Sequence, residues 1–116
     1  MTINRLRSTQ RYSHIVVHND TVYLAGQVAD DVQADITGQT KQCLMKVETL
    51  LGEAGSSREH ILSATIFLRD MADFSAMNLV WDEWVSAIGK PTRACVEARM
   101  ASPDILVEIC IIAAVA

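Results

Sequence analysis

The stretch Lys90-Pro-Thr-Arg-Ala-Cys-Val-Glu97 is the part of this sequence around which the rest is organised. The residues after the proline are of the types that strands favour, so the stretch predicts a β-strand. Because strand side chains alternate between two faces, Arg93 and Cys95 are expected to share one face. A guanidinium and a thiol therefore lie two residues apart in the same strand.

The segment 105–115 that follows is apolar apart from Glu108. An ionised carboxylate among such neighbours is costly unless it is paired or hydrogen-bonded. One interpretation is a structural ion pair, in which Arg93 or Arg99 meets Glu97 or Glu108. The other is functional: Arg93 binds a small carboxylate through a two-pronged hydrogen bond, and Glu108 orients a water or moves a proton. Composition and spacing alone favour the structural interpretation.

Length and composition restrict the class of protein. A chain of 116 residues is expected to form one domain, 1–116, and its apolar half with a fifth of charged residues is typical of a globular protein. No apolar run reaches the roughly 18 residues of a membrane span, and the first residues lack the apolar core of a signal peptide. We therefore expect a cytoplasmic protein without a membrane partner. The net charge of −4 argues against a nucleic-acid partner.

The sequence gives no support for a metal or a nucleotide cofactor. Its three cysteines are odd in number and lack CxxC spacing, which argues against a disulfide framework and a zinc site. His14 and His18 share a strand face, but four residues of strand separate them by roughly 13 Å. No phosphate-binding glycine loop is present.

The pattern of apolar residues predicts an α+β protein with a single sheet and both helices on one of its faces. The other face of the sheet is also apolar, so we expect it to be buried against copies of the same chain. The expected strands are 2–6, 12–18, 21–28, 61–68, 92–100 and 105–115, and the expected helices are 37–54, ended by Gly55, and 71–88, capped by Asp70.

Three residues do not fit their surroundings simply. Gly26 interrupts a strand, which indicates either a plain bulge or a close approach to the backbone. Asn78 lies in the apolar stripe of the second helix, where its amide needs partners; a bond to a neighbouring backbone is favoured over a ligand contact. Cys43 lies in the apolar stripe of the first helix and is expected to be a packed, unreactive thiol.

The segment Pro-Thr-Arg-Ala-Cys-Val-Glu at 91–97, followed by Val-Glu-Ile at 107–109, resembles the C-terminal signature of the RidA/YjgF family, the reactive intermediate (enamine/imine) deaminases. The resemblance extends from Tyr12 onward. Further segments that match the family in order and spacing are 23–27, 64–70 and 73–78.

The resemblance implies a chorismate-mutase-like fold, a mixed sheet with two helices packed on one face. It also implies that the final strand lies inside the sheet, away from its predecessor in the chain. Members of the family are typically homotrimers, with ligand sites in the clefts between subunits. We therefore expect a RidA-like homotrimer without a cofactor.

The family's functional residues map onto five positions of this sequence. By resemblance, Arg93 binds the substrate carboxylate, the Cys95 main chain helps to hold a water, and Glu108 polarises that water. Gly26 presents its backbone N–H beside the ligand, and Tyr12 lines the cleft. The implied activity is that of a 2-iminobutanoate/2-iminopropanoate deaminase-like hydrolase, which converts 2-aminoacrylate or other 2-imino acids to 2-keto acids and ammonia.

One position departs from the family pattern. The residue before Gly26 often carries a hydroxyl group, and here it is Ala25. The absence of this hydroxyl group puts the substrate preference in question. It leaves a second function open, that of a non-catalytic protein that binds a keto or amino acid in the same cleft.

Overall fold

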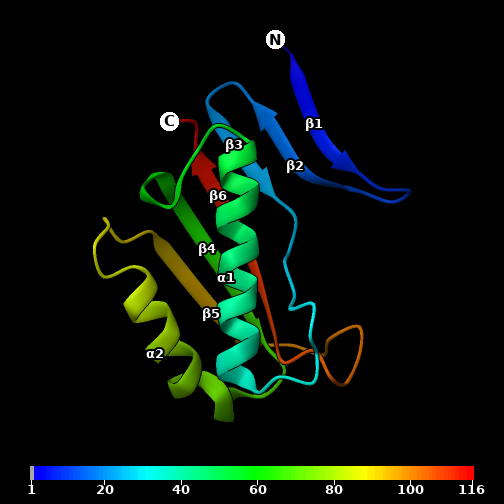
Figure 1. Ribbon diagram of the computed structural model, residues 1–116, viewed down its shortest axis with the longest axis vertical. Coiled ribbons are helices and arrows are strands. Elements are labelled where there is room, and N and C mark those ends of the chain that lie inside the picture. The colour runs from blue at the N-terminus through cyan, green and yellow to red at the C-terminus, as the bar shows by residue number, and fades with distance from the viewer. Residues whose placement is uncertain (1) are drawn as a thin grey trace.

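The computed structural model describes residues 2–116, which form a six-stranded mixed sheet with two helices on one face (Figure 1). This confirms the predicted fold class. The strands are β1 (Ile3–Ser8), β2 (Ser13–His18), β3 (Thr21–Leu24), β4 (Ile61–Leu68), β5 (Thr92–Glu97) and β6 (Val107–Ala114), and the helices are α1 (Ile36–Glu53) and α2 (Phe74–Trp84).

The final strand lies in the middle of the sheet. The strand order is β1-β2-β3-β6-β4-β5, so β6 pairs with β3 and β4 and never with β5. Each of these pairs is antiparallel except β4 with β5, which is parallel. The expectation that the last two strands are separated in the sheet is confirmed, and β5 is left as an edge strand.

The helix α1 begins and ends where the sequence predicts. The Asp35 carboxylate accepts a hydrogen bond from the Gly38 N–H at 2.8 Å and so caps the first turn. Gly55, with φ of 79°, follows the last turn in the left-handed conformation that glycine adopts without strain. The thiol of Cys43 is fully buried under this helix, as expected. Within residues 2–116, no helix is long and apolar enough to cross a membrane.

The second helix is shorter than predicted. Asp70 accepts a hydrogen bond from the Ala72 N–H at 2.9 Å and caps a 3₁₀ turn, Met71–Asp73, before α2 starts at Phe74. At the other end, the Ser86 hydroxyl donates to the Glu83 carbonyl, which offers the backbone an alternative to continued helix. The predicted helix 71–88 is therefore wrong at both ends, although Val85 and Ile88 are buried in the core as expected.

Three strands also end earlier than predicted. The strand expected at 21–28 stops at Leu24, the one at 92–100 stops at Glu97, and the one at 105–115 covers 107–114. Pairing between β3 and β6 ends at Tyr23 and Ile112 and resumes as an isolated bridge between Gln27 and Ile109. This break brings Gly26 to the carboxylate described below.

The sheet face opposite the helices is open in a single chain. Its apolar side chains include Tyr23, Val96 and Ile112, which are 44%, 45% and 37% exposed. In β4 the helix side is buried, at Ala64, Ile66 and Leu68. Residues 2–116 leave the opposite face of the sheet partly exposed.

Candidate functional site

Arg93 lies on the edge strand β5, with its side chain on the helix side of the sheet. It is paired in parallel register with Ala64, which is buried under the helices, and cross-strand neighbours point to the same face. One guanidinium nitrogen donates a hydrogen bond to the Asn78 Oδ1 atom at 2.7 Å. The guanidinium carbon lies 5.8 Å from the centre of the Phe74 ring and 5.6 Å from that of Trp81.

The spacing of these partners on α2 explains the arrangement. Phe74, Asn78 and Trp81 follow each other at intervals of four and three residues, which places them on one face of a helix. This is the apolar stripe that the sequence predicted. The position of Asn78 in it is now explained: its amide oxygen binds the guanidinium, where the sequence favoured a backbone bond.

Arg93 has no carboxylate partner among residues 2–116. The ion pairs of this part of the chain are Arg7 with Glu53, Lys46 with Asp30, and Arg58 with Glu48. Glu97 instead accepts a hydrogen bond from the Met71 N–H at 2.9 Å. The structural interpretation, an ion pair of Arg93 or Arg99 with Glu97 or Glu108, is therefore wrong within a single chain.

Glu108 lies on the opposite face of the sheet. It is paired with Phe67 in β4, while its neighbours in sequence, Val107 and Ile109, point toward the helices and are fully buried. The Glu108 side chain is half-buried on the open face and forms no ion pair with another described residue. It is thus a second charged group without a counter-ion among residues 2–116.

Gly26 is in direct contact with this carboxylate. A Cβ atom at Gly26 would collide with the Glu108 Oε2 atom, would lie 2.9 Å from the carboxyl carbon and would lie 3.1 Å from the Cys110 Sγ atom. The Gly26 N–H makes no hydrogen bond within residues 2–116. Between the Tyr23–Ile112 pair and the Gln27–Ile109 bridge, three residues on the β3 side face two on β6, which is a bulge. Both interpretations of Gly26 therefore hold: it lies in a bulge, and a carboxylate approaches its backbone closely.

Arg93 and Glu108 are not brought together in one chain. Ala64 of β4 pairs with Arg93 on one side and with Ile111 of β6 on the other. Because Ile111 is three residues from Glu108, Arg93 and Glu108 are offset by about 10 Å along the strand direction. The two strands are also separated by β4, which adds roughly another 10 Å. The side chains leave opposite faces of the sheet. The two groups are therefore not in contact within one chain.

Cys95 lies beside Arg93 on the helix side, but its main chain faces the free edge of the sheet. Ala98 donates its N–H to the Leu68 carbonyl, and backbone groups alternate between the two sides of a strand. The Cys95 N–H and carbonyl therefore point away from β4. Burial raises the pKa of the Cys95 thiol, and the Arg93 guanidinium opposes that shift.

The other two thiols are also poor nucleophiles at neutral pH. Burial raises the pKa of the Cys43 thiol to about 12. Burial and the Glu108 charge both raise the pKa of the Cys110 thiol. A raised pKa leaves less of the reactive thiolate.

The remaining predicted residues, Tyr12 and Ala25, both lie beside His14. The Tyr12 ring is 51% exposed and lies edge-on to His14, with 5.1 Å between ring centres. Ala25 donates its N–H to the His14 carbonyl at 2.9 Å and accepts a hydrogen bond from the Gln27 amide at 3.0 Å. Gln27 was not predicted; its signal was a polar residue in an otherwise apolar strand, and it is 2% exposed.

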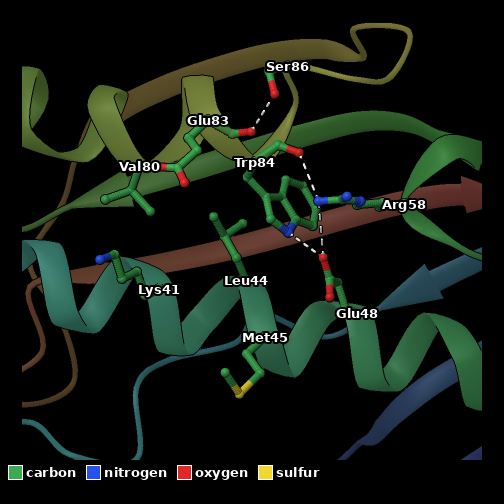
Figure 2. Close-up of a pocket in the computed structure, with 9 residues that line it drawn as sticks. All are labelled: Lys41, Leu44, Met45, Glu48, Arg58, Val80, Glu83, Trp84 and Ser86. Carbon is green, nitrogen blue, oxygen red and sulfur yellow. Dashed lines mark hydrogen bonds and ion pairs between the residues drawn. The ribbon is translucent and has the colours of Figure 1, made fainter.

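The groove between the helices contains none of the predicted site residues. It has a volume of about 500 Å³, and Trp84 borders it with its indole N–H on the Glu48 carboxylate at 2.7 Å (Figure 2). Arg58 donates to the Trp84 carbonyl from the far end of the groove. Across the described residues, no group of three His, Cys, Asp or Glu side chains could hold a metal ion.

Known proteins share both the sequence and this arrangement of strands. The family model described as Endoribonuclease L-PSP matches residues 2–115. A RutC family protein of Haemophilus influenzae is 44% identical over 114 residues, which are 97% of this chain and 98% of that protein. RutC family protein YoaB of Escherichia coli is 44% identical over 115 residues, which are 99% of this chain and 100% of that protein.

Solved structures agree with the sequence relatives. The crystal structure of NMB1025 from Neisseria meningitidis, described as a member of the YjgF protein family, has a TM-score of 0.94 and 44% identity, covering 98% of this chain and 95% of that one. That of Rv2704 from Mycobacterium tuberculosis, described as a member of the YjgF/YER057c/UK114 family, has a TM-score of 0.89. The sheet order and the helix placement are therefore those of the chorismate-mutase-like fold, and the chain belongs to the RutC/YjgF family, also called the Rid family.

Proposed function

We propose that this protein hydrolyses reactive enamine and imine intermediates, 2-aminoacrylate or other 2-imino acids, to 2-keto acids and ammonia. The observation that carries the proposal is the state of Arg93: a half-buried cation, held in place by Asn78 and two rings, without a carboxylate in its own chain. Such a group is costly unless something else uses its charge. A substrate carboxylate is the partner that its planar fork of donors fits best.

In the proposed reaction, water adds to the imine carbon. The water oxygen forms a bond to that carbon while the Glu108 carboxylate takes a proton, which then passes to the nitrogen. The hydroxyl proton of the tetrahedral adduct then passes to the amino group as the carbon–nitrogen bond breaks, which releases ammonia and leaves the keto group. No electrons are gained or lost, and the imine carbon is already electrophilic. The unpaired N–H of Gly26 beside Glu108 supports a site for a polar group at this point.

The two halves of the proposed site come from different subunits. Arg93 and Glu108 lie on opposite faces of their own sheet, so a site that contains both needs two chains. The apolar open face also requires cover, which neighbouring copies supply in the proposed homotrimer. The Cys95 main chain, at the free edge of β5, is then available to hold the attacking water.

Ala25 replaces the hydroxyl-bearing residue that is frequent at this position in the family. Its side chain carries no hydroxyl, and its carbonyl is already bonded to the Gln27 amide. We infer that Ala25 contributes shape to the cleft and no hydrogen bond through its side chain. Nucleic acid is not a proposed ligand, because the net charge is −4 and Arg7, in the basic first strand, is paired with Glu53.

Replacing the proposed anchor tests the function. Arg93→Ala removes a charge-assisted two-pronged contact worth on the order of 3 kcal/mol, so keto-acid formation is expected to fall by about 100-fold or more. Imino acids are generated in situ by an amino-acid oxidase, and keto acid is measured over time. Arg99→Ala, a change at an exposed arginine outside β5, is the matched control and is expected to keep full activity.

Equal keto-acid formation by the Arg93→Ala variant and the unchanged protein would contradict the assignment. Saturable keto-acid binding that depends on Arg93, with no turnover of any imine, would instead identify the non-catalytic binding protein.

A second prediction concerns the contact between Gly26 and Glu108. Gly26→Ala forces the carboxylate aside, and this is tolerated by the fold because the atom in contact is the end of a flexible side chain. We expect activity to fall at least about tenfold while the free energy of unfolding changes by less than about 1 kcal/mol. Chemical denaturation and the same oxidase-coupled assay measure the two quantities.

The control is Gly52→Ala in α1, where a Cβ atom would meet nothing within 4 Å. It should leave activity unchanged and raise the free energy of unfolding by about 0.5–1 kcal/mol. Full activity in Gly26→Ala would show that the position of the Glu108 carboxylate is not needed.

The proposed assembly makes its own prediction. Light scattering at micromolar concentration is expected to give three times the 12.8 kDa mass of the chain, because the open sheet face is covered only in the assembly. A mass of one chain under these conditions would contradict both the cover of the open face and the shared site.

A further inference from the structure

We propose that Asn78 is the positioning residue of Arg93: its amide oxygen fixes the guanidinium between Phe74 and Trp81, so that the remaining N–H groups face a substrate carboxylate. The inference rests on the proposed function, in which Arg93 binds that carboxylate, and adds the group that sets the orientation of Arg93.

The hydrogen bond fixes one corner of the guanidinium. Arg93 carries five N–H donors in a rigid plane and accepts no hydrogen bond, so only an acceptor atom of Asn78 can face it. The 2.7 Å distance to Oδ1 is short, as expected for a charge-assisted bond. One donor is used and four stay available, which is enough for a two-pronged contact with a carboxylate.

The choice of an amide at this position preserves the charge of Arg93. A carboxylate of the same shape would also accept the bond, but it would neutralise the cation and compete with a negatively charged ligand. A neutral acceptor orients the guanidinium and leaves its full positive charge for the ligand. This is why Asn78, unlike an acidic residue, fits a role in positioning.

The two rings restrict the remaining motion of Arg93. Trp81 is 6% exposed and Phe74 packs against the core, so both rings are held by the fold. Their centres lie 5.6 Å and 5.8 Å from the guanidinium carbon, within the range of an attractive cation–π contact. The side chain therefore meets its ligand already ordered, which lowers the entropic cost of binding.

The test uses Asn78→Ala and Asn78→Asp, with Ser75→Ala on the exposed part of α2 as the matched control. Two readouts are followed: the order of the Arg93 side chain, from ¹⁵N relaxation of its Nε–H group, and the affinity for 2-oxobutanoate. Affinity is read from tryptophan emission in a Trp84→Phe background, because the chain has two tryptophans and Trp81, which contacts Arg93, is then the only one.

We expect Asn78→Ala to make the Arg93 side chain mobile and to weaken 2-oxobutanoate binding by roughly tenfold, the usual effect of losing one bond to a charged group. Asn78→Asp is expected to keep Arg93 ordered and the protein as stable as before, yet to weaken binding by more than Asn78→Ala. If Asn78 had a purely structural role, Asn78→Asp would bind 2-oxobutanoate more tightly than Asn78→Ala, because the isosteric acid preserves the contact with Arg93.

Each outcome decides the inference. An Arg93 side chain that is equally ordered in Asn78→Ala, or an Asn78→Asp variant that binds as tightly as the Trp84→Phe parent, would overturn the role of Asn78 alone. If the parent protein turns over no imine but the three proteins rank in 2-oxobutanoate affinity as expected, the deaminase assignment is wrong and the role of Asn78 is supported. Absence of any 2-oxobutanoate binding by the parent would overturn both.

Discussion

The alternation of side chains along a β-strand is the constraint on which this structure depends. It places Arg93 on the helix side of β5 and Glu108 on the open side of β6, with β4 between them. Glu108 is the one charged residue of β6, and Arg93 shares β5 with Glu97, which bonds to the Met71 N–H. Neither Arg93 nor Glu108 has an ion-pair partner among residues 2–116.

The two charges are stabilised in different ways. The cation of Arg93 is held by an amide oxygen and two ring faces, which order it without neutralising it. Glu108 lies against the backbone of Gly26, at a point where β3 has stopped pairing with β6.

Local chemistry made much of the fold predictable. Asp35 and Gly55 set the ends of α1 to within one residue, and the apolar run Ile61–Leu68 was predicted with its observed bounds. The apolar stripe of α2 and the Asp70 cap were also predicted, but the cap opens a 3₁₀ turn and the helix ends before Ser86, whose hydroxyl bonds to the Glu83 carbonyl; the apolar spacing did not indicate either end.

The site was predictable only as a set of residues. Glu108 stood out as the only charge in an apolar segment, and Arg93 because it shares a strand face with Cys95. Their opposite faces follow from the pairing of the strands, which spacing along the chain does not determine. The partner of Asn78 was missed for the same reason: α2 and β5 meet only once the sheet is assembled. Gln27 was missed although it is a polar residue in the otherwise apolar predicted strand 21–28, because its burial depends on the bridge to Ile109.

The central claim is that Arg93 of one chain and Glu108 of another form one site, and subunit mixing tests it most directly. Arg93→Ala and Glu108→Gln chains are unfolded together in equal amounts and refolded, beside the unchanged protein as a refolding control. Three quarters of random trimers contain both chains, and each of these has one intact site of its three, so about a quarter of the unchanged activity is expected. A mixture as inactive as either variant alone would show that both residues act within one chain and would contradict the account.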